Sequence, residues 1–359
     1  MFSNEEKQQY DRHFILDKIG TEGQTKLKNS KVLVIGAGGL GCPILQYLTA
    51  AGVGTIGIVD KDTVNRSNLQ RQILFTIDDL NKPKASCAAQ RLQQLNPFVN
   101  FEVHLEFLTI ENALTLFSQY DIIVDGSDNF QTRYLSNDAA YITKKPLVYG
   151  AIYKFEGQVS VFNYDNGPTY RCLFPNPPDA NSIPNCSEIG VLGVLPGIIG
   201  CLQANEVLKI ICGLDGILSG KLLSLNSLSL QQNILKFKKT ENANVSKLLQ
   251  NYEVFCGIET DNPLEINAND LQKALANKEI TLLDVRKDLE RSLFHIGGMH
   301  IPLHNLQQQL EDIKDNNPIV VYCQIGQRSL IAAKIILEKY PNKSVQSLTG
   351  GITAWKKLS

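Results

Sequence analysis

The chain has 359 residues, of which 43% are hydrophobic and 20% are charged, and this composition is typical of a folded globular protein with more than one domain. Its 35 lysines and arginines nearly balance its 36 aspartates and glutamates, so no global charge favours nucleic acid or an anionic membrane as a partner. The N-terminus lacks an apolar signal segment and the eight cysteines form no Cys-x-x-Cys pair, so we expect a cytoplasmic protein without a disulfide framework.

The first part of the chain alternates apolar strands with helices. Residues 31–36 predict a strand, residues 37–52 a glycine turn leading into a helix, and residues 55–60 a second strand. The alternation continues with predicted helices over 84–95, 110–117 and 129–143 and predicted strands over 101–105, 120–126 and 146–150. Such alternation indicates an α/β fold with a Rossmann-like, mostly parallel sheet covered by helices.

The pattern changes after residue 150. A predicted strand over 157–164 is followed by a long crossing loop rich in proline and asparagine over 166–190. A helix over 197–213 and strands over 221–227 and 231–238 complete this region. We therefore place one domain at 1–255, the end of a linker at 256–263, and a smaller α/β domain at 264–359.

A nucleotide fingerprint lies between the first predicted strand and helix. Gly36, Gly38 and Gly41 match the G-x-G-x-x-G spacing, and Asp60 ends the next strand. Glycines let a backbone approach phosphates at a helix N-terminus, and an acidic residue at this position can bind ribose hydroxyls. Taken alone, this fingerprint is typical of an NAD site.

The following residues favour a triphosphate over a dinucleotide. Arg66, Arg71, Lys82 and Lys84 bring positive charge to the phosphate side, and a triphosphate carries more negative charge than the phosphate bridge of NAD. Asp128 follows another predicted parallel strand, at the edge of the sheet where ligands of such folds bind. A carboxylate beside phosphates is suited to Mg²⁺.

These motifs resemble the MoeB/ThiF adenylyltransferases, which are relatives of the ubiquitin-activating enzymes. The resemblance covers residues 5–255 and rests on "GAGGLGCP", "SNLQRQ", "KPK", "DGSDN", "GQVSVF" and "GVLGVLPGIIGCLQANEVLK". It implies that ATP adenylates the C-terminal glycine of a small ubiquitin-fold sulfur carrier and that pyrophosphate is released. The positions that match the nucleotide site of the family are Gly36, Gly38, Gly39, Gly41, Asp60, Ser67, Asn68, Arg71, Lys84, Asp128 and Asn129.

The same resemblance assigns roles to individual residues. Asp128 is implied to hold Mg²⁺, and Arg71 to bind the phosphates. Arg12 matches an arginine that reaches across a dimer into the neighbouring nucleotide site, so a homodimer is implied. Cys186, in the crossing loop, matches a family cysteine that takes part in acyl or disulfide transfer. Such a reactive thiol needs solvent access and a lowered pKa more than it needs packing.

A second reactive cysteine is predicted near the C-terminal end. Cys323 follows the apolar strand "PIVVY" and opens a loop that leads into a helix, where backbone N–H groups and the helix N-terminus favour a thiolate or persulfide. Residues 264–359 resemble the rhodanese family, whose loop cysteine carries a transferable sulfane sulfur. The predicted persulfide loop is formed by Gln324, Ile325, Gly326, Gln327 and Arg328.

The two halves together resemble the MOCS-type adenylyltransferase/sulfurtransferases. Their combination implies that one domain activates a carboxylate and the other delivers sulfur to it, which leaves a thiocarboxylate on a carrier that ends in Gly-Gly. A cysteine desulfurase is the expected persulfide donor. Molybdopterin synthesis, thiamine synthesis and tRNA thiolation all remain open as pathways.

The family's zinc motif is incomplete in this chain. Many members bind structural zinc through two Cys-x-x-Cys pairs, whereas here Cys172 and Cys256 are accompanied by Thr169 and Glu253. Two thiols with a hydroxyl and a carboxylate form a poor tetrahedral zinc site, so we predict no zinc and expect free thiols or a bridging pair.

Two other functions compete with this interpretation. An NAD-dependent oxidoreductase fused to a rhodanese domain would leave "SNLQRQ", Lys84 and Asp128 without a role. A catalytically idle scaffold that binds a ubiquitin-like tail would not require four residues that are present here, namely Arg71, Asp128, Cys186 and Cys323.

Overall fold

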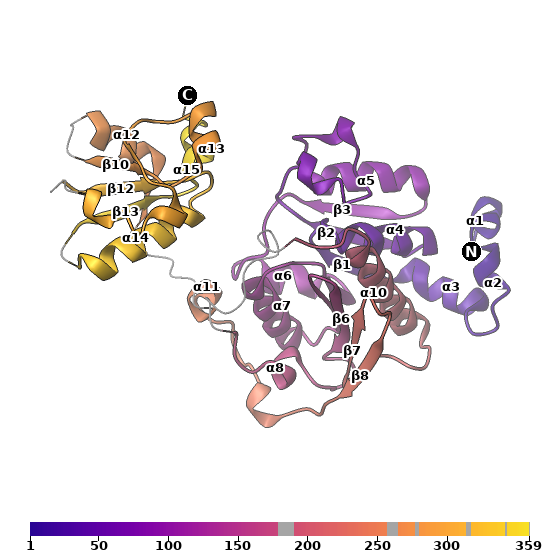
Figure 1. Cartoon of the computed structure of the whole chain (residues 1–359). Coiled ribbons are helices and arrows are strands. Elements are labelled where there is room, and N and C mark those ends of the chain that lie inside the picture. The colour runs from indigo at the N-terminus through magenta and orange to yellow at the C-terminus, as the bar shows by residue number, and fades with distance from the viewer. Residues whose placement is uncertain (179–189, 257–264, 277–279, 314–316, 342, 359) are drawn as a thin grey trace. The chain divides into compact units, whose positions relative to one another are not determined.

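The computed structural model describes residues 1–178, 190–256, 265–276, 280–313, 317–341 and 343–358. The chain forms two units, Met1–Ile258 and Glu259–Ser359, and each is described by itself (Figure 1). Cys186 lies outside the described residues.

The first unit contains an eight-stranded sheet with the order β3-β2-β1-β4-β5-β6-β7-β8. The strands β3, β2, β1, β4 and β5 pair in parallel, and β6, β7 and β8 continue the sheet in antiparallel pairing. The bounds are β1 Lys31–Ile35, β2 Thr55–Val59, β3 Asn100–His104, β4 Ile122–Asp125, β5 Leu147–Tyr153, β6 Glu156–Phe162, β7 Lys221–Asn226 and β8 Gln232–Lys236. The mostly parallel α/β fold predicted from the sequence is thereby confirmed.

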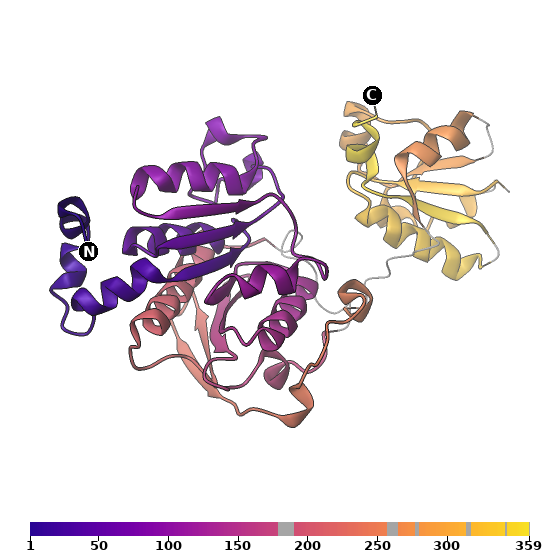
Figure 2. The ribbon, with the colours of Figure 1, turned by 180° about the vertical axis from the view of Figure 1, so that it is seen from behind.

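Helices cover both faces of this sheet (Figures 1 and 2). In β1, Val32 and Val34 face one hydrophobic cluster, while Leu33 and Ile35 face another, as the period of two in a strand requires. The first cluster includes side chains from α3 (Gly20–Asn29), α4 (Gly41–Ala51), α5 (Lys84–Leu95) and α10 (Val194–Cys212). The second includes side chains from α6 (Ala113–Ser118), α7 (Phe130–Ile142), α8 (Tyr170–Leu173) and α11 (Tyr252–Phe255).

Some local expectations need correction. The N-terminal helices α1 (Asn4–Gln9), α2 (Asp11–Phe14) and α3 were not predicted, because they carry few apolar residues. Cys42 and Cys212 are buried, and Cys201 is half-buried. Among the described residues, the α10 helix alone is long and apolar enough to cross a membrane by length and composition, and it packs against β5, β6 and α4.

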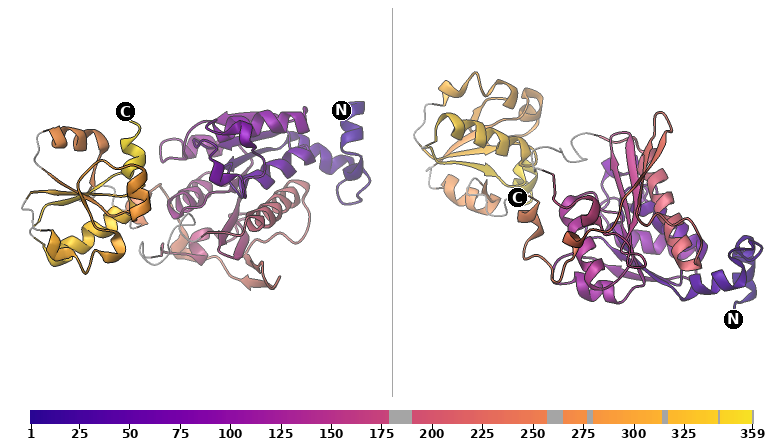
Figure 3. Two further views of the ribbon diagram at one scale, coloured as in Figure 1. Left: turned by 45° about the horizontal axis from the view of Figure 1, so that its top comes forward. Right: turned by 90° about the horizontal axis from the view of Figure 1, so that it is seen from below.

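The second unit has a five-stranded parallel sheet with the order β11-β10-β12-β13-β9. Its strands are β9 Glu265–Ile266, β10 Thr281–Asp284, β11 Met299–His300, β12 Ile319–Tyr322 and β13 Val345–Leu348. Helices lie on both faces (Figure 3) and are α12 Ala268–Ala276, α13 Asp288–Leu293, α14 Gln327–Lys339 and α15 Gly351–Trp355. Of the predicted persulfide loop, Gln324, Ile325 and Gly326 lie between β12 and α14, whereas Gln327 and Arg328 form the first residues of α14.

Candidate active site

The glycine turn between β1 and α4 brings the start of the helix against the end of the strand. Gly36 has a φ of +88°, a left-handed conformation that favours glycine. A Cβ atom on Gly41 would lie 2.0 Å from the Gly36 carbonyl oxygen, and a Cβ atom on Gly36 would lie 3.1 Å from the Gly126 oxygen. The spacing of the glycines therefore reflects backbone packing as well as access for a ligand.

A cleft with a volume of about 720 Å³ opens beside this turn. It lies at the carboxyl ends of the parallel strands, where ligands of open α/β sheets bind. The predicted residues that line it are Gly36, Gly38, Gly39, Asp60, Ser67, Arg71, Lys84, Asp128 and Asn129. The fold thus brings residues from five separate segments around one cavity.

Asp60 lines the cleft and is only 9% exposed. Its Oδ2 atom accepts a hydrogen bond from the Ala37 N–H (2.8 Å), and its Oδ1 atom accepts one from the Asp62 N–H (2.8 Å). Burial raises the pKa of Asp60 above its usual value, while these hydrogen bonds act to lower it. The carboxylate is therefore fixed against the glycine turn, in the position expected of a residue that binds ribose hydroxyls.

Two cations of the cleft are held by neighbouring groups. The buried Lys84 places its Nζ atom 3.0 Å from the Asp62 carboxylate, and Arg71 donates a hydrogen bond from Nη1 to the Ser67 carbonyl oxygen at 3.1 Å. Both side chains keep further donors for a ligand, because an ammonium has three N–H groups and a guanidinium has five. The arrangement can bind an anion with several oxygens.

The loop after β4 supplies the acidic side of the cleft. Asp128 is exposed, and Asn129 caps α7 by accepting a hydrogen bond from the Thr132 N–H at 2.9 Å. One free carboxylate beside bound phosphates fits the way Mg²⁺ is held in nucleotide sites, with the remaining ligands from phosphates and water. Asp128 is the residue in this cleft that would hold such an ion.

Five predicted residues do not line the cleft in this structure, and two of them, Arg66 and Lys82, are exposed side chains outside it. Gly41 belongs to the helix start and acts through packing, as described above. The Asn68 Oδ1 atom accepts a hydrogen bond from the Asn65 N–H (3.0 Å), which occupies it locally. Arg12 lies in α2 with a side chain that is 88% exposed and 3.5 Å from Asp11.

Other cleft residues were not singled out from the sequence. Arg133, in the first turn of α7, is 8% exposed and lies against the rings of Phe130 (5.2 Å) and Tyr149 (5.8 Å). Glu253, from α11, also lines the cleft, although it is far from the glycine turn in sequence. The loop after β3 contributes Glu106, Phe107, Leu108 and Thr109. The position of this loop at the cleft depends on the parallel pairing of β3 with β2, which places the end of β3 beside the end of β2. Only the order of strands in the sheet could have indicated it.

The predicted persulfide loop surrounds Cys323, which is fully buried. The Sγ atom accepts a hydrogen bond from the Gly326 N–H at 3.2 Å, and the Ser329 hydroxyl lies 3.5 Å from it. Gly326 has a φ of +99°, and a Cβ atom there would lie 3.0 Å from the Gly350 nitrogen. The two contacts hold the Sγ atom inside the loop between β12 and α14.

Arg328, at the end of this loop, forms a bidentate ion pair with Glu290 of α13, with distances of 2.8 and 2.6 Å. Hydrogen bonding to Arg328 lowers the pKa of Glu290 to about 2. The pair therefore stays ionised at neutral pH and joins the loop to α13.

The positions of the incomplete zinc motif carry hydrogen bonds. Burial acts to raise the pKa of Cys172, but hydrogen bonds from Thr169 and Thr240 outweigh it and lower this pKa. The Cys172 Sγ atom accepts a hydrogen bond from the Thr240 N–H at 3.4 Å. Cys172 and Cys256 are free thiols, and burial raises the pKa of Cys256 to about 11. No group of three or more His, Cys, Asp or Glu residues suited to a metal occurs in the described parts of the chain, and the absence of zinc stays a prediction.

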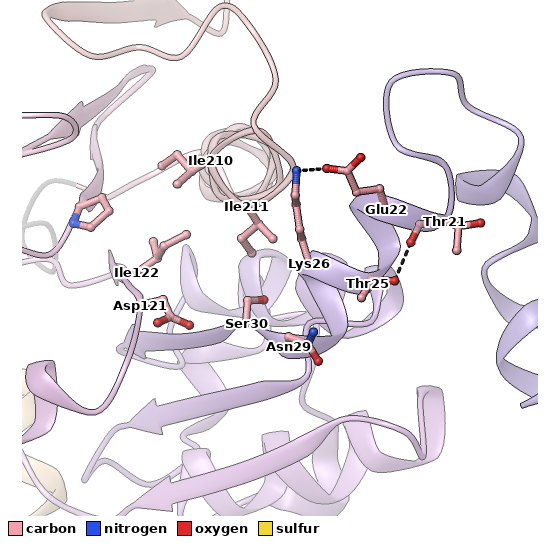
Figure 4. A pocket seen from close by; sticks show the side chains of 11 residues that line it. Thr21, Glu22, Thr25, Lys26, Asn29, Ser30, Asp121, Ile122, Ile210 and Ile211 are labelled. Carbon is pink, nitrogen blue, oxygen red and sulfur yellow. Dashed lines mark hydrogen bonds and ion pairs between the residues drawn. The ribbon is translucent and has the colours of Figure 1, made fainter. Parts of the chain in front are cut away.

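A second hollow, of about 750 Å³, lies between α3 and the end of α10 (Figure 4). Its lining includes Lys26 and Glu22, which form an ion pair at 2.7 Å, and the apolar residues Ile210 and Ile211. None of the predicted site residues lines this hollow. The predicted nucleotide chemistry therefore belongs to the cleft beside the glycine turn.

Comparison with known families accounts for both units. The ThiF family matches residues 10–247, and the rhodanese-like domain matches residues 267–358. The chain is 40% identical to the probable adenylyltransferase/sulfurtransferase MoeZ of Mycobacterium tuberculosis over 99% of this chain and 94% of the relative. It is 41% identical to the adenylyltransferase and sulfurtransferase MOCS3 of Drosophila grimshawi over 98% of this chain and 84% of the relative.

A shorter relative matches the first unit. The sulfur carrier protein adenylyltransferase of Thermus thermophilus is 48% identical over 72% of this chain and 99% of its own length. Among solved structures, Escherichia coli MccB with MccA-N7isoAsn has a TM-score of 0.59 over 68% of this chain and 75% of that one, at 21% identity. This last likeness concerns the fold alone.

Proposed function

Because the chain belongs to the ThiF family and ends in a rhodanese-like domain, we propose that it adenylates the C-terminal glycine of a ubiquitin-like sulfur carrier and then transfers sulfur to it. Relatives of nearly the same length are named adenylyltransferase/sulfurtransferases, and another is named a sulfur carrier protein adenylyltransferase. The observation that carries the proposal is the cleft itself, which combines Asp60, Arg71, Lys84 and Asp128 around a glycine turn.

In the first step, a carboxylate oxygen of the carrier attacks the α-phosphorus of ATP. A bond from phosphorus to the carrier forms, the bond to the bridging oxygen breaks, and pyrophosphate leaves. Arg71 and Lys84 stabilise the negative charge that shifts onto pyrophosphate, and Asp60 orients the ribose. Mg²⁺, which Asp128 would hold, supplies further neutralisation of phosphate charge when bound.

A homodimer is part of this proposal. Arg12 is exposed and lies outside the cleft of its own chain, so it is free to reach the nucleotide of a partner, as the family resemblance implies. A guanidinium brought to a triphosphate from another subunit would add charge at the moment of transfer.

In the second step, the outer sulfur of a Cys323 persulfide attacks the carrier carbonyl, AMP leaves, and an acyl disulfide forms. A thiol then attacks the Cys323 sulfur, so that the thiocarboxylate leaves with the outer sulfur and a new disulfide remains on the enzyme. We assign this thiol to Cys186. A thiol reductant must then reduce the disulfide before the next turnover.

The sulfur donor is proposed from the chemistry that a Cys323 persulfide requires. Cys323 needs a donor that already carries sulfane sulfur, and we propose a cysteine desulfurase in the cytoplasm. The loop itself offers little free positive charge, because Gln324 and Gln327 are neutral and Arg328 forms an ion pair with Glu290. The final product could serve molybdopterin synthesis, thiamine synthesis or tRNA thiolation.

The test is the intact mass of candidate carriers that end in Gly-Gly after incubation with the protein, Mg-ATP, a persulfide source and a thiol reductant. We expect one carrier to exchange its terminal oxygen for sulfur, only with ATP and intact Cys323. The variant Cys323→Ala should still adenylate the carrier but form no thiocarboxylate. A chain that adds neither AMP nor sulfur to any carrier, and that binds a nicotinamide cofactor instead, would overturn the proposal.

A further inference from the structure

Arg328 closes the predicted persulfide loop, in the first turn of α14. The other arginines of the second unit, Arg286 and Arg291, bind the fully buried Asp284 at 2.8 and 3.4 Å. Both also donate hydrogen bonds to backbone carbonyl oxygens. The guanidinium that a sulfur donor meets at this loop is therefore that of Arg328.

A carboxylate from another helix neutralises this guanidinium. Glu290, in α13, accepts hydrogen bonds from both terminal nitrogens of Arg328, at 2.8 and 2.6 Å. The hydrogen bonds to Glu290 raise the pKa of Arg328 above its usual value, and the neighbouring Cys323 acts in the same direction. Arg328 therefore interacts with the carboxylate and with the sulfur of the loop. Both side chains of the pair are 32% exposed, so the pair is within reach of a small anion from solvent.

The pair of Arg328 and Glu290 has hydrogen-bond donors but no net charge. Glu290 uses two of the five N–H groups of the guanidinium, so donors remain for a sulfur atom. The attraction of a small anion depends on net charge, which Glu290 cancels. Backbone N–H groups at the start of α14 favour any anionic sulfur, so they do not distinguish one donor from another. Thiosulfate is a dianion whose sulfonate group is best bound by a free guanidinium, whereas the sulfur of a thiol persulfide carries one charge.

We propose that Glu290 is a specificity-determining residue, which disfavours thiosulfate and thereby restricts Cys323 to thiol persulfides as sulfur donors. This inference rests on the sulfur transfer proposed above and adds the class of donor that the loop accepts. In loading from a persulfide, the Cys323 thiolate attacks the outer sulfur, a new S–S bond forms, and the donor thiolate leaves with the electron pair of the broken S–S bond. Thiosulfate would react in the same way, with sulfite as the leaving group. The chemistry therefore permits both donors, and binding separates them.

The first experiment measures the loading of Cys323 in the full-length protein. The reduced protein is mixed with thiosulfate or with cysteine persulfide, and the gain of one sulfur atom is followed by intact mass, with Cys323→Ala as the background. For the original chain we expect the second-order rate constant for cysteine persulfide to exceed that for thiosulfate at least about 100-fold. Comparable rate constants for the two donors would overturn the inference without the use of any charge variant.

The variant Glu290→Gln removes the carboxylate charge and keeps the size of the side chain. We expect loading from thiosulfate to become at least about tenfold faster. Because an electrostatic free energy is proportional to the charge of the ligand, the singly charged cysteine persulfide should gain only about threefold. Glu311→Gln makes the same charge change at an 84% exposed side chain that lies 3.4 Å from Lys339, and it should alter neither rate. Equal gains for both donors, or no gain for thiosulfate, would contradict the inference.

The double variant Glu290→Gln/Arg328→Gln identifies the group that attracts the anion. The two positions again carry no net charge, so the ratio of the thiosulfate to the persulfide rate constant should return to within about twofold of its original value. If the gain for thiosulfate persists without Arg328, another cation binds the anion and the inference is wrong. The comparison of donors on the original chain decides the matter even if neither variant folds. If neither donor loads Cys323 of the original chain, the proposed sulfur transfer itself fails, and the inference fails with it.

Discussion

The glycine turn gives the sharpest prediction, through the variant Gly41→Ala. The added methyl carbon would lie 2.0 Å from the Gly36 carbonyl oxygen and 2.8 Å from its carbon, both of which are backbone atoms that no rotamer change can move. An ordinary contact between carbon and oxygen is more than about 1 Å longer, so α4 and the turn must separate by a distance of that order. Overpacking of this kind costs about 2–3 kcal/mol, which lowers the unfolding midpoint of a unit of this size by about 5–10 °C.

The same displacement should affect catalysis, because the turn forms one wall of the cleft. A shift of about 1 Å in a positioned reactant can reduce the rate about 100-fold. Thermal unfolding and pyrophosphate exchange measure the two effects on one preparation.

The matched control is Gly38→Ala. A Cβ atom there would meet only the Gln72 Nε2 atom, at an ordinary 3.7 Å, so the unfolding midpoint should hardly change. Gly38 lines the cleft, however, so the KM for ATP should rise. If Gly41→Ala unfolds at the original temperature with full exchange activity, the packing argument for this glycine is incorrect.

Three further predictions concern charge and backbone geometry. Lys84→Met should raise the KM for ATP at least about tenfold in pyrophosphate exchange. Lys82→Met, at an exposed neighbouring position, should leave this KM unchanged. Equal effects of the two variants would contradict the role of the buried Lys84 ammonium. Arg328 lowers the pKa of Glu290 from 4.5 to about 2, so the pair stabilises the second unit above about pH 4.5 and loses this contribution as the pH falls through about 2. The variant Glu290→Gln should therefore remove that part of the pH dependence of the unfolding midpoint of the second unit. Gly326→Ala should strain the persulfide loop at its φ of +99° and slow sulfur transfer while adenylation stays unchanged, and a variant with normal transfer would show that this conformation is not needed.

The sequence by itself determined the features that depend on local pattern. Apolar periodicity located the parallel strands and α5 within a few residues, because a strand or helix buried on one side requires that period. The positions of Gly36 and Gly326 were also readable, since each lies in a turn whose positive φ only glycine adopts easily. The family motifs likewise named nine of the residues that line the cleft.

The tertiary structure decided what depends on contacts between distant segments. The sequence gives no sign that Glu253 lies at the same cleft as Gly38, or that Asp138 is paired with Arg171 and Tyr252. Single polar residues have no periodicity, and their partners are set by how α7, α8 and α11 pack on one face of the sheet. A buried carboxylate must find its donors wherever the fold brings them, so only the packed structure could show that the end of the first unit is anchored beside the nucleotide cleft.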